Sequence, residues 1–226
     1  MKIVFLGNSL TWGGYGADFV AEVARRLPQH EIINAGEGGN TILNLRRRLD
    51  SVLEQQPDGI FVMGGGNDAI SASQPETRRY YERVQKVPDG IVTPELFTQT
   101  YRDLLTHIQM HHVIAWVGLA PMEHNPTVVA ALQDYNARTR EIAEALRIDV
   151  LDLMAHFPPP DPVPDRPPLS QDTINLIGKH TREKWSDYAT AQAAGGYTFT
   201  FDGLHLMPEV GPKVADLIVD FLDLPD

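Results

Sequence analysis

Short apolar runs alternate with longer amphipathic segments along nearly the whole chain of 226 residues. The short runs predict buried strands, and they cover residues 3–6, 31–34, 60–63, 113–117 and 149–153. The longer segments carry apolar side chains at helical spacing, and they cover residues 16–27, 41–55, 95–110, 127–146 and 208–222. Strands that alternate with helices favour a parallel sheet covered on both faces. We therefore predict an α/β fold with three α/β/α layers and a five-stranded parallel sheet, flavodoxin-like in layout.

Two segments interrupt this alternation. Residues 64–94 are rich in Gly, Ser and Pro, and we expect a long connection there. Residues 158–168 contain seven prolines, which favour stiff, extended backbone and forbid helix. One helix over residues 172–194 is expected to follow, with Gly195-Gly196 as its stop. We interpret the chain as a single domain over residues 1–226 with an insertion at about 158–200.

Composition excludes several classes of protein. The chain has no cysteine, which removes disulfides, thiolate metal sites and a cysteine nucleophile. Its one basic triplet, Arg46-Arg47-Arg48, falls in an amphipathic segment, so we expect these arginines on a solvated helix face. Because the formal net charge is −11, we expect no nucleic-acid partner. No apolar run approaches the ~20 residues of a membrane span. We expect a cytoplasmic protein without a membrane partner, because Met1-Lys2 leads into an apolar run too short for a signal peptide.

Residues typical of catalysis gather at one edge of the predicted sheet. Ser9 follows the first strand, Gly39 the second and Asn67 the third, while Asp202 and His205 precede the last helix. In open parallel sheets, ligands bind outside the carboxyl ends of the strands. These separate segments are therefore expected to share one site.

The residue types at this edge form a complete set for acyl transfer. Ser9 would be the nucleophile, and His205 would be the general base, oriented by Asp202 three residues earlier. The backbone N–H groups of Ser9 and Gly39 and the amide of Asn67 would bind an oxyanion. Each segment alone also fits a structural role, such as a helix cap, a tight turn or a surface loop. We expect no metal and no cofactor, because no histidine has a partner at metal-ligand spacing.

Four blocks of sequence resemble those of the SGNH hydrolases, the GDSL-like lipase/esterase family, in the same order and across nearly the whole chain. They are Gly7-Asn8-Ser9-Leu10-Thr11, Asn34-Ala35-Gly36-Glu37-Gly38-Gly39-Asn40-Thr41, Gly65-Gly66-Asn67-Asp68 and Asp202-Gly203-Leu204-His205. The resemblance implies the roles given above for Ser9, Gly39, Asn67, Asp202 and His205. It also shows one departure, because Asn8 stands where the family usually has aspartate.

We therefore expect a serine hydrolase that cleaves a small-molecule or glycan ester through an acyl-enzyme on Ser9. A carbohydrate O-deacetylase is a plausible subclass, because the family includes such enzymes. Two alternatives stay open: acyl transfer to an acceptor other than water, and a binding module that kept the fold without catalysis. The sequence does not reveal the acyl chain, the alcohol or whether the chain forms a homo-oligomer. The insertion is expected to wall the site, and Trp12, Glu37, Asn40 and His124 lie on loops near it.

Overall fold

The computed structural model describes residues 1–224 and contains a sheet of five parallel strands. Their order across the sheet is β2-β1-β3-β4-β5, which is the flavodoxin-like order. The strands are β1 (Lys2–Gly7), β2 (Glu31–Gly36), β3 (Gly59–Met63), β4 (Ile114–Leu119) and β5 (Asp149–Asp152). The predicted fold class is confirmed, and each strand lies within two residues of its expected position.

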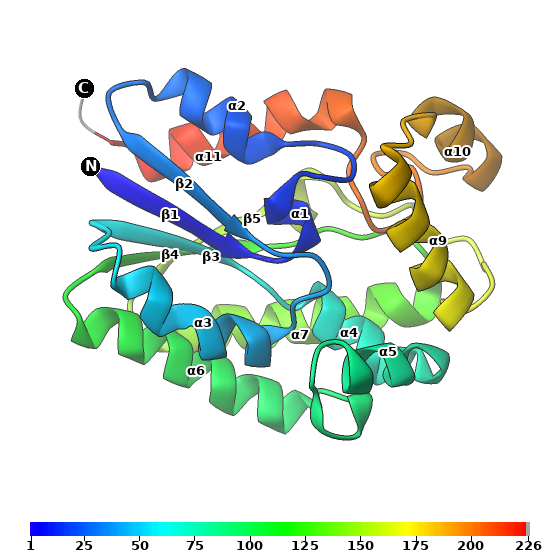
Figure 1. Cartoon of the computed structure of the whole chain (residues 1–226), viewed down its shortest axis with the longest axis horizontal. Helices are drawn as coiled ribbons and strands as arrows, with labels where there is room; N and C mark the ends of the chain where they lie inside the picture. Colours follow the sequence, from blue (N-terminus) through cyan, green and yellow to red (C-terminus); the bar gives the residue numbers. More distant parts are fainter. Residues whose placement is uncertain (225–226) are drawn as a thin grey trace.

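Helices cover both faces of the sheet (Figure 1). One face carries α2 (Phe19–Arg26) and α11 (Gly211–Leu222), which pack against each other. The other carries α3 (Ile42–Leu53), α6 (Pro94–Met110) and α7 (Pro126–Ala145). Alternate residues of a strand point to opposite faces, so β1 contributes Val4 and Leu6 to one core and Ile3 and Phe5 to the other.

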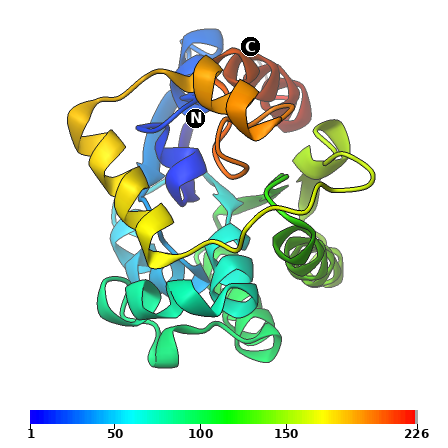
Figure 2. The same ribbon diagram turned by 90° about the vertical axis from the view of Figure 1, so that its right-hand side faces the viewer.

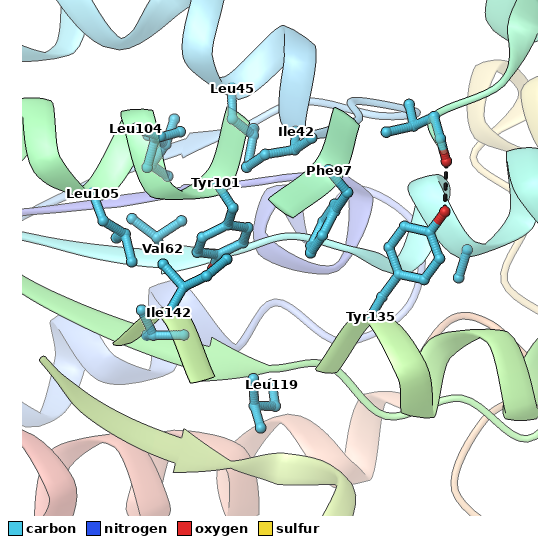
Figure 3. Close-up of a cluster of buried hydrophobic side chains, with 14 of the residues drawn as sticks. Ile42, Leu45, Val62, Phe97, Tyr101, Leu104, Leu105, Leu119, Tyr135 and Ile142 are labelled. Atoms are coloured by element: carbon cyan, nitrogen blue, oxygen red, sulfur yellow. Dashed lines mark hydrogen bonds between the residues drawn. The ribbon is translucent and has the colours of Figure 1, made fainter. Parts of the chain in front are cut away.

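The larger core lies between the sheet and α3, α6 and α7 (Figure 3). Leu45 of α3, Phe97 and Tyr101 of α6 and Val62 of β3 are completely buried. Burying each large apolar side chain stabilises the fold by about 1.5–3 kcal/mol. The hydroxyl of Tyr135 on α7 donates a hydrogen bond to a backbone carbonyl across the core, so this buried polar group is satisfied.

The segment 64–94 is not the long connection that the sequence predicts. It contains α4 (Gly66–Ser73), α5 (Arg78–Arg83) and two 3₁₀ helices, η1 (Pro75–Thr77) and η2 (Pro88–Gly90). Each helix spans at most eight residues, which is too short for an apolar period to be read from the sequence. These helices are stabilised by packing: α4 lies against α7, and α5 against η2.

The helix expected over residues 172–194 is in fact two helices. α9 (Gln171–Glu183) ends at Glu183. The next residue, Lys184, has a left-handed φ of 52°, and α10 (Tyr188–Gly195) begins four residues after Lys184. The chain turns there because Trp185 and Tyr188 pack against Phe201, with ring centroids 6.1 and 4.5 Å away. Burial of these aromatic rings outweighs the preference for one continuous helix.

The carboxyl ends of all five strands point to one side of the molecule (Figures 1 and 2). The short helix α1 (Ser9–Trp12) lies in the middle of that side, with α9 and α10 on its rim and α4 and α5 across from them (Figure 2). Further along the chain, α8 (Leu153–His156) follows β5, and η3 (Pro208–Val210) precedes α11. Within residues 1–224, no helix combines the length and the apolar character needed to span a bilayer.

Candidate active site

Ser9 is the first residue of α1, directly beyond the end of β1. Asn8 caps this helix, because its side-chain oxygen accepts a hydrogen bond from the Leu10 N–H at 3.1 Å. Asparagine thus provides the acceptor that the turn requires, although it carries no charge. The short, capped helix holds the Ser9 hydroxyl at the carboxyl edge of the sheet.

Asp202, His205 and Ser9 form a continuous chain of hydrogen bonds. Oδ2 of Asp202 lies 2.8 Å from Nδ1 of His205, and Nε2 of the same ring lies 3.0 Å from Oγ of Ser9. The other carboxylate oxygen accepts from the backbone N–H groups of Leu204 and His205 at 2.9 and 2.7 Å. Both carboxylate oxygens are therefore held, which gives the imidazole one orientation toward Ser9.

The surroundings of Asp202 keep its carboxylate ionised. Burial by itself would raise the pKa of Asp202, but the charge and hydrogen bond of His205 and two backbone N–H groups outweigh it and lower the pKa below the usual value. An ionised Asp202 favours a proton on Nδ1 of His205. Nε2 is then free to accept the proton of the Ser9 hydroxyl.

A tight turn brings Asp202 and His205 together. Thr200 and Leu206 form an antiparallel bridge on either side of it, and the Phe201 N–H donates to the His205 carbonyl at 3.1 Å. Gly203 has a φ of +85°, and a Cβ there would lie 2.6 Å from Cα of His124. Only glycine fits this left-handed, crowded position. The Asp-x-x-His spacing thus depends on the glycine between the two residues.

Glu123 anchors the segment that leads into this turn, and sequence reasoning missed it. Its side chain is completely buried. It accepts hydrogen bonds from the backbone N–H groups of Thr198, Phe199 and Thr200 at 2.8–3.0 Å, and from the hydroxyls of Thr198 and Thr200. One carboxylate therefore fixes three consecutive residues just before Asp202. No motif marks Glu123, because its partners lie about 75 residues further along the chain.

Arg166 connects the proline-rich segment to the same region. Its guanidinium donates to the carbonyls of Glu123 and His124 at 3.0 and 2.8 Å, and to those of Gly195 and Gly196. It also stacks 4.2 Å from the centre of the Tyr197 ring. A planar group with five N–H donors can join several carbonyls at once, so Arg166 holds the 158–168 stretch beside the Asp202 turn.

Gly39 and Asn67 border the same cavity as Ser9 and His205. Gly39 has a φ of +78°, and a Cβ there would lie 2.1 Å from the hydroxyl oxygen of Tyr80, so glycine is required. The Asn67 amide nitrogen donates to the Asn40 carbonyl at 3.0 Å, which leaves its second N–H for another acceptor. The predicted oxyanion donors are thus brought to one place with the predicted nucleophile and base.

Asp68 fixes the start of α4, which carries Asn67, relative to the start of α3, which follows the loop with Gly39. Its buried carboxyl group accepts from the Ile42 N–H at the start of α3, with distances of 2.9 and 3.2 Å to its two oxygens. Burial raises the pKa of Asp68 to about 7, against the opposing effect of these backbone hydrogen bonds. Asp68 therefore couples the first turn of α4 to the first turn of α3.

Arg48 is not the solvated residue that the basic triplet predicts. Its guanidinium donates to Oδ1 of Asn40 at 2.9 Å and to the carbonyl of Gly7 at 2.7 Å. Its side chain is only 17% exposed, and burial lowers its pKa. Arg48 thus joins the end of β1, just before Ser9, to the loop beside Gly39. Of the triplet, Arg47 is the exposed residue that fits the expectation, and the partly buried Arg46 forms ion pairs with exposed carboxylates.

An aromatic cluster supports His205 from the side of α9 and α10. The Tyr15 ring packs edge-on against His205 with centroids 5.1 Å apart, and the Tyr15 hydroxyl lies 2.9 Å from Nδ1 of His180. His180 in turn stacks on Trp185 at 4.3 Å. The packing limits the movement of the His205 ring, and it includes residues from the segment expected to be an insertion.

Of the four residues expected on loops near the site, Glu37, Asn40 and His124 lie on loops and contact other parts of the protein, whereas Trp12 is the last residue of α1. Asn40 is bound by Arg48, and the exposed Glu37 lies 3.8 Å from the same guanidinium. His124 contacts the carbonyls of Asp202 and Pro167. Trp12 is 39% exposed on α1. Among residues 1–224, none of these four side chains belongs to the lining of the cavity beside Ser9.

A profile of the GDSL-like lipase/acylhydrolase family matches residues 5–208. The chain belongs to this family. The match spans the segments that contain Ser9, Gly39, Asn67, Asp202 and His205, so the resemblance in the sequence motifs is confirmed at the level of the family. Membership makes the chain a carboxylic ester hydrolase. A search of curated proteins found no match.

Several solved structures share the fold. An acetyl xylan esterase, AlAXEase, superposes with a TM-score of 0.65 at 18% identity, covering 97% of this chain and 98% of that one. A mutant of Axe2, an acetylxylan esterase from Geobacillus stearothermophilus, gives a TM-score of 0.67 at 17% identity, covering 99% and 94%. A lipase/acylhydrolase from Enterococcus faecalis gives 0.62 at 20% identity, covering 97% and 93%. The three-layer architecture is therefore shared along nearly the full length of each chain.

Proposed function

We propose that this esterase works through an acyl-enzyme on Ser9, with His205 as general base and Asp202 as the residue that orients it. The observation that carries the proposal is the chain of hydrogen bonds from Asp202 to His205 at 2.8 Å and from His205 to the Ser9 hydroxyl at 3.0 Å. Both distances lie within the range needed for proton transfer.

In the first half-reaction, Oγ of Ser9 attacks the ester carbonyl carbon while its proton moves to Nε2 of His205. The carbonyl π electrons move onto the oxygen, which becomes an oxyanion. When this tetrahedral intermediate collapses, the bond to the alcohol oxygen breaks and His205 gives its proton to that oxygen. The alcohol leaves, and the acyl group remains bonded to Ser9.

The oxyanion would be bound by the N–H groups of Ser9 and Gly39 and by the amide of Asn67. A helix N-terminus favours negative charge nearby, and Ser9 is the first residue of α1. The Asn67 side chain is held by two hydrogen bonds, to the Asn40 carbonyl at 3.0 Å and from the Tyr81 hydroxyl at 2.8 Å. Donors fixed before the reaction stabilise charge without reorganising.

In the second half-reaction, water takes the place of the alcohol. His205 removes a proton from the water, whose oxygen attacks the acyl carbon, and the carboxylic acid leaves as Ser9 recovers its proton from His205. Throughout, the ionised Asp202 stabilises the imidazolium form of His205. In this proposed reaction, the five residues Ser9, Gly39, Asn67, Asp202 and His205 and a water molecule carry out every step.

Structures of the Axe2 esterase support these roles. Separate Axe2 structures are described as catalytic mutants in which alanine replaces a serine, an aspartate or a histidine. The aspartate and histidine are three positions apart in that enzyme, as Asp202 and His205 are here. The same three residue types, with the same spacing between two of them, thus recur on a shared fold.

A fluorophosphonate probe and a chromogenic ester together test the proposal. The native protein should release p-nitrophenol from p-nitrophenyl acetate in a burst equal to the enzyme concentration, and mass spectrometry should find the probe on Ser9. Ser9→Ala should abolish both signals while its circular dichroism and Tm stay unchanged. Labelling of a different serine, with turnover retained in Ser9→Ala, would refute the assignment.

Carbohydrate O-deacetylation is a second candidate, favoured by the acetylxylan esterases among the structural neighbours. Release of acetate from acetylated xylo-oligosaccharides would test it. Transfer to an acceptor other than water would be seen as an acetylated alcohol when the reaction is run in the presence of glycerol or a sugar. A protein that binds esters without turnover would be a binding module, and the absence of a burst would identify it.

A further inference from the structure

A cavity of about 240 Å³ extends from Ser9 and His205. It lies between α9 on one side and α4, η1 and α5 on the other, and these elements face each other across the end of the sheet (Figure 2). Ser9, Gly39, Asn67 and His205 are all part of its lining. A group bound in this cavity would therefore lie in direct contact with the reacting centre.

Aliphatic side chains form much of the walls of this cavity, together with two tyrosines and three threonines. Ile70 comes from α4, Ile174 and Ile177 come from α9, and Leu169 and Leu204 complete the apolar surface. The described part of the lining contains no lysine, arginine, aspartate or glutamate. An apolar lining with a few polar groups at one end is suited to an apolar ligand with a single polar group.

Besides Ser9, five hydroxyl groups line the cavity, and three of them already donate within the protein, whereas the Tyr80 hydroxyl accepts from the Gln85 side-chain amide at 2.9 Å and keeps its own proton for another acceptor. Thr77, Tyr81 and Thr181 each donate their hydroxyl proton to an oxygen of the protein, at 2.7–2.9 Å. A sugar ring in this cavity would need partners for several hydroxyls, and each buried hydroxyl left without one would weaken binding. The walls of the cavity offer few free hydrogen-bonding groups, so they disfavour a sugar ring in this cavity.

The size of the cavity argues against acetyl as the group that fills it. At about 30 Å³ for a water-sized group, 240 Å³ holds about eight such groups. An acetyl group contributes two carbons and one oxygen, so most of the space would be left unfilled. A straight acyl chain of about six carbons with its carbonyl oxygen matches the volume.

The position of the walls favours the acyl side of the ester over the alcohol side. The proposed oxyanion donors, which would bind the carbonyl oxygen of the acyl group, line this cavity together with His205. Ile70 is three residues beyond Asn67 on α4, and the Tyr81 hydroxyl donates to Asn67. The apolar surface is thus continuous with the proposed oxyanion donors.

We propose that this cavity binds the acyl chain of the substrate, and that the preferred substrates are esters of straight-chain acids with about six carbons. The inference rests on the proposed role of Ser9. It assigns α9 the function of a specificity wall, with Ile174 and Ile177 in contact with the chain. The preferred ester therefore differs from the acetyl esters named for the structural neighbours.

A series of p-nitrophenyl esters from acetate to dodecanoate tests the chain length. Each buried methylene is worth up to about four-fold in kcat/KM. We expect kcat/KM to rise at least ten-fold from acetate to hexanoate and to fall again by dodecanoate, when the chain exceeds the cavity. A maximum at acetate would overturn the inference.

Two neighbouring residues of α9 provide a matched pair of variants. Ile177 lines the cavity, whereas Leu176 does not and is 49% exposed. Ile177→Trp should fill the space and lower the hexanoate-to-acetate ratio of kcat/KM at least ten-fold. Leu176→Trp should leave the ratio unchanged. Equal ratios in both variants, with Tm within a few degrees of the native protein, would overturn the assignment of α9.

Two further measurements separate the possible failures. Ethyl hexanoate and hexyl acetate carry the same six-carbon chain on opposite sides of the ester, and a pH-stat can follow the hydrolysis of both. A higher kcat/KM for hexyl acetate would overturn the assignment of the cavity to the acyl chain. Calorimetry of hexanoate with Ser9→Ala needs no turnover. Hexanoate should bind to Ser9→Ala and should not bind to the double variant that also carries Ile177→Trp. This result would support the acyl-chain cavity even if the native protein hydrolysed no ester, and in that case only the proposed function would fail.

Discussion

Replacing Glu123 with glutamine would test how the proposed triad of Ser9, His205 and Asp202 is held in place. The substitution keeps the shape of the side chain but removes its charge and turns one acceptor oxygen into an N–H₂ donor. Oε2 accepts from the backbone N–H and the hydroxyl of Thr198, and Oε1 accepts from Thr198, Phe199 and Thr200. The amide cannot serve every one of these buried donors.

The size of the effect follows from these hydrogen bonds. A hydrogen bond to a charged group contributes about 1.5–3 kcal/mol and a neutral one about 0.5–1.5 kcal/mol, while an unsatisfied buried donor costs about 1–3 kcal/mol. Several weakened bonds and one unpaired donor together predict a loss of about 3–5 kcal/mol in the free energy of unfolding. Because the anchored segment leads directly into Asp202 and His205, a displacement of about 1 Å would lower kcat by up to about 10²-fold.

Urea denaturation and ester kinetics on Glu123→Gln measure both effects. Glu209→Gln is the control, because Glu209 is exposed on η3 close to the same turn and should change the free energy of unfolding by less than about 0.5 kcal/mol. The Glu123 variant should lose stability and kcat, with KM less affected. If both variants unfold at the same urea concentration and kcat is unchanged, Glu123 does not position the triad and the reasoning is wrong.

Three further predictions concern the oxyanion side of the site. Asn67→Ala should lower kcat about 10²–10³-fold with a smaller change in KM; a raised KM at constant kcat would instead make Asn67 a ground-state contact. Arg48→Met should lower kcat, and in urea denaturation it should lower the free energy of unfolding by about 1–3 kcal/mol. Arg46→Met, which removes only ion pairs to exposed carboxylates, should change kcat and the free energy of unfolding very little. Because burial raises the pKa of Asp68 to about 7, protonation of Asp68 favours the folded state, so the free energy of unfolding should fall as the pH rises from about 4 through 7. Urea titrations at pH 5 and pH 8 should show a smaller difference for Asp68→Asn than for the native protein, and an equal difference would refute the assignment.

Much of the fold could be predicted because its signals are local. An apolar run followed by an amphipathic segment records a buried strand and its covering helix, and this pattern repeats along the chain. The errors fall where the signal is not local. The helices of segment 64–94 are too short to show a period, and α9 separates from α10 because Trp185 and Tyr188 pack against Phe201.

By itself, the sequence determined the parallel sheet, the edge of the sheet at which the candidate site residues meet, and the identity of those residues, which are Ser9, Gly39, Asn67, Asp202 and His205. Those features follow from periodicity and from motifs that span a few residues each. Only the tertiary structure decided that Glu123 holds the segment before the triad, that Arg48 faces inward and that α9 closes an apolar cavity beside Ser9. These features depend on contacts between residues 41 to 165 positions apart. Side chains of one type look alike in a sequence until packing decides whether they contact water or the protein interior.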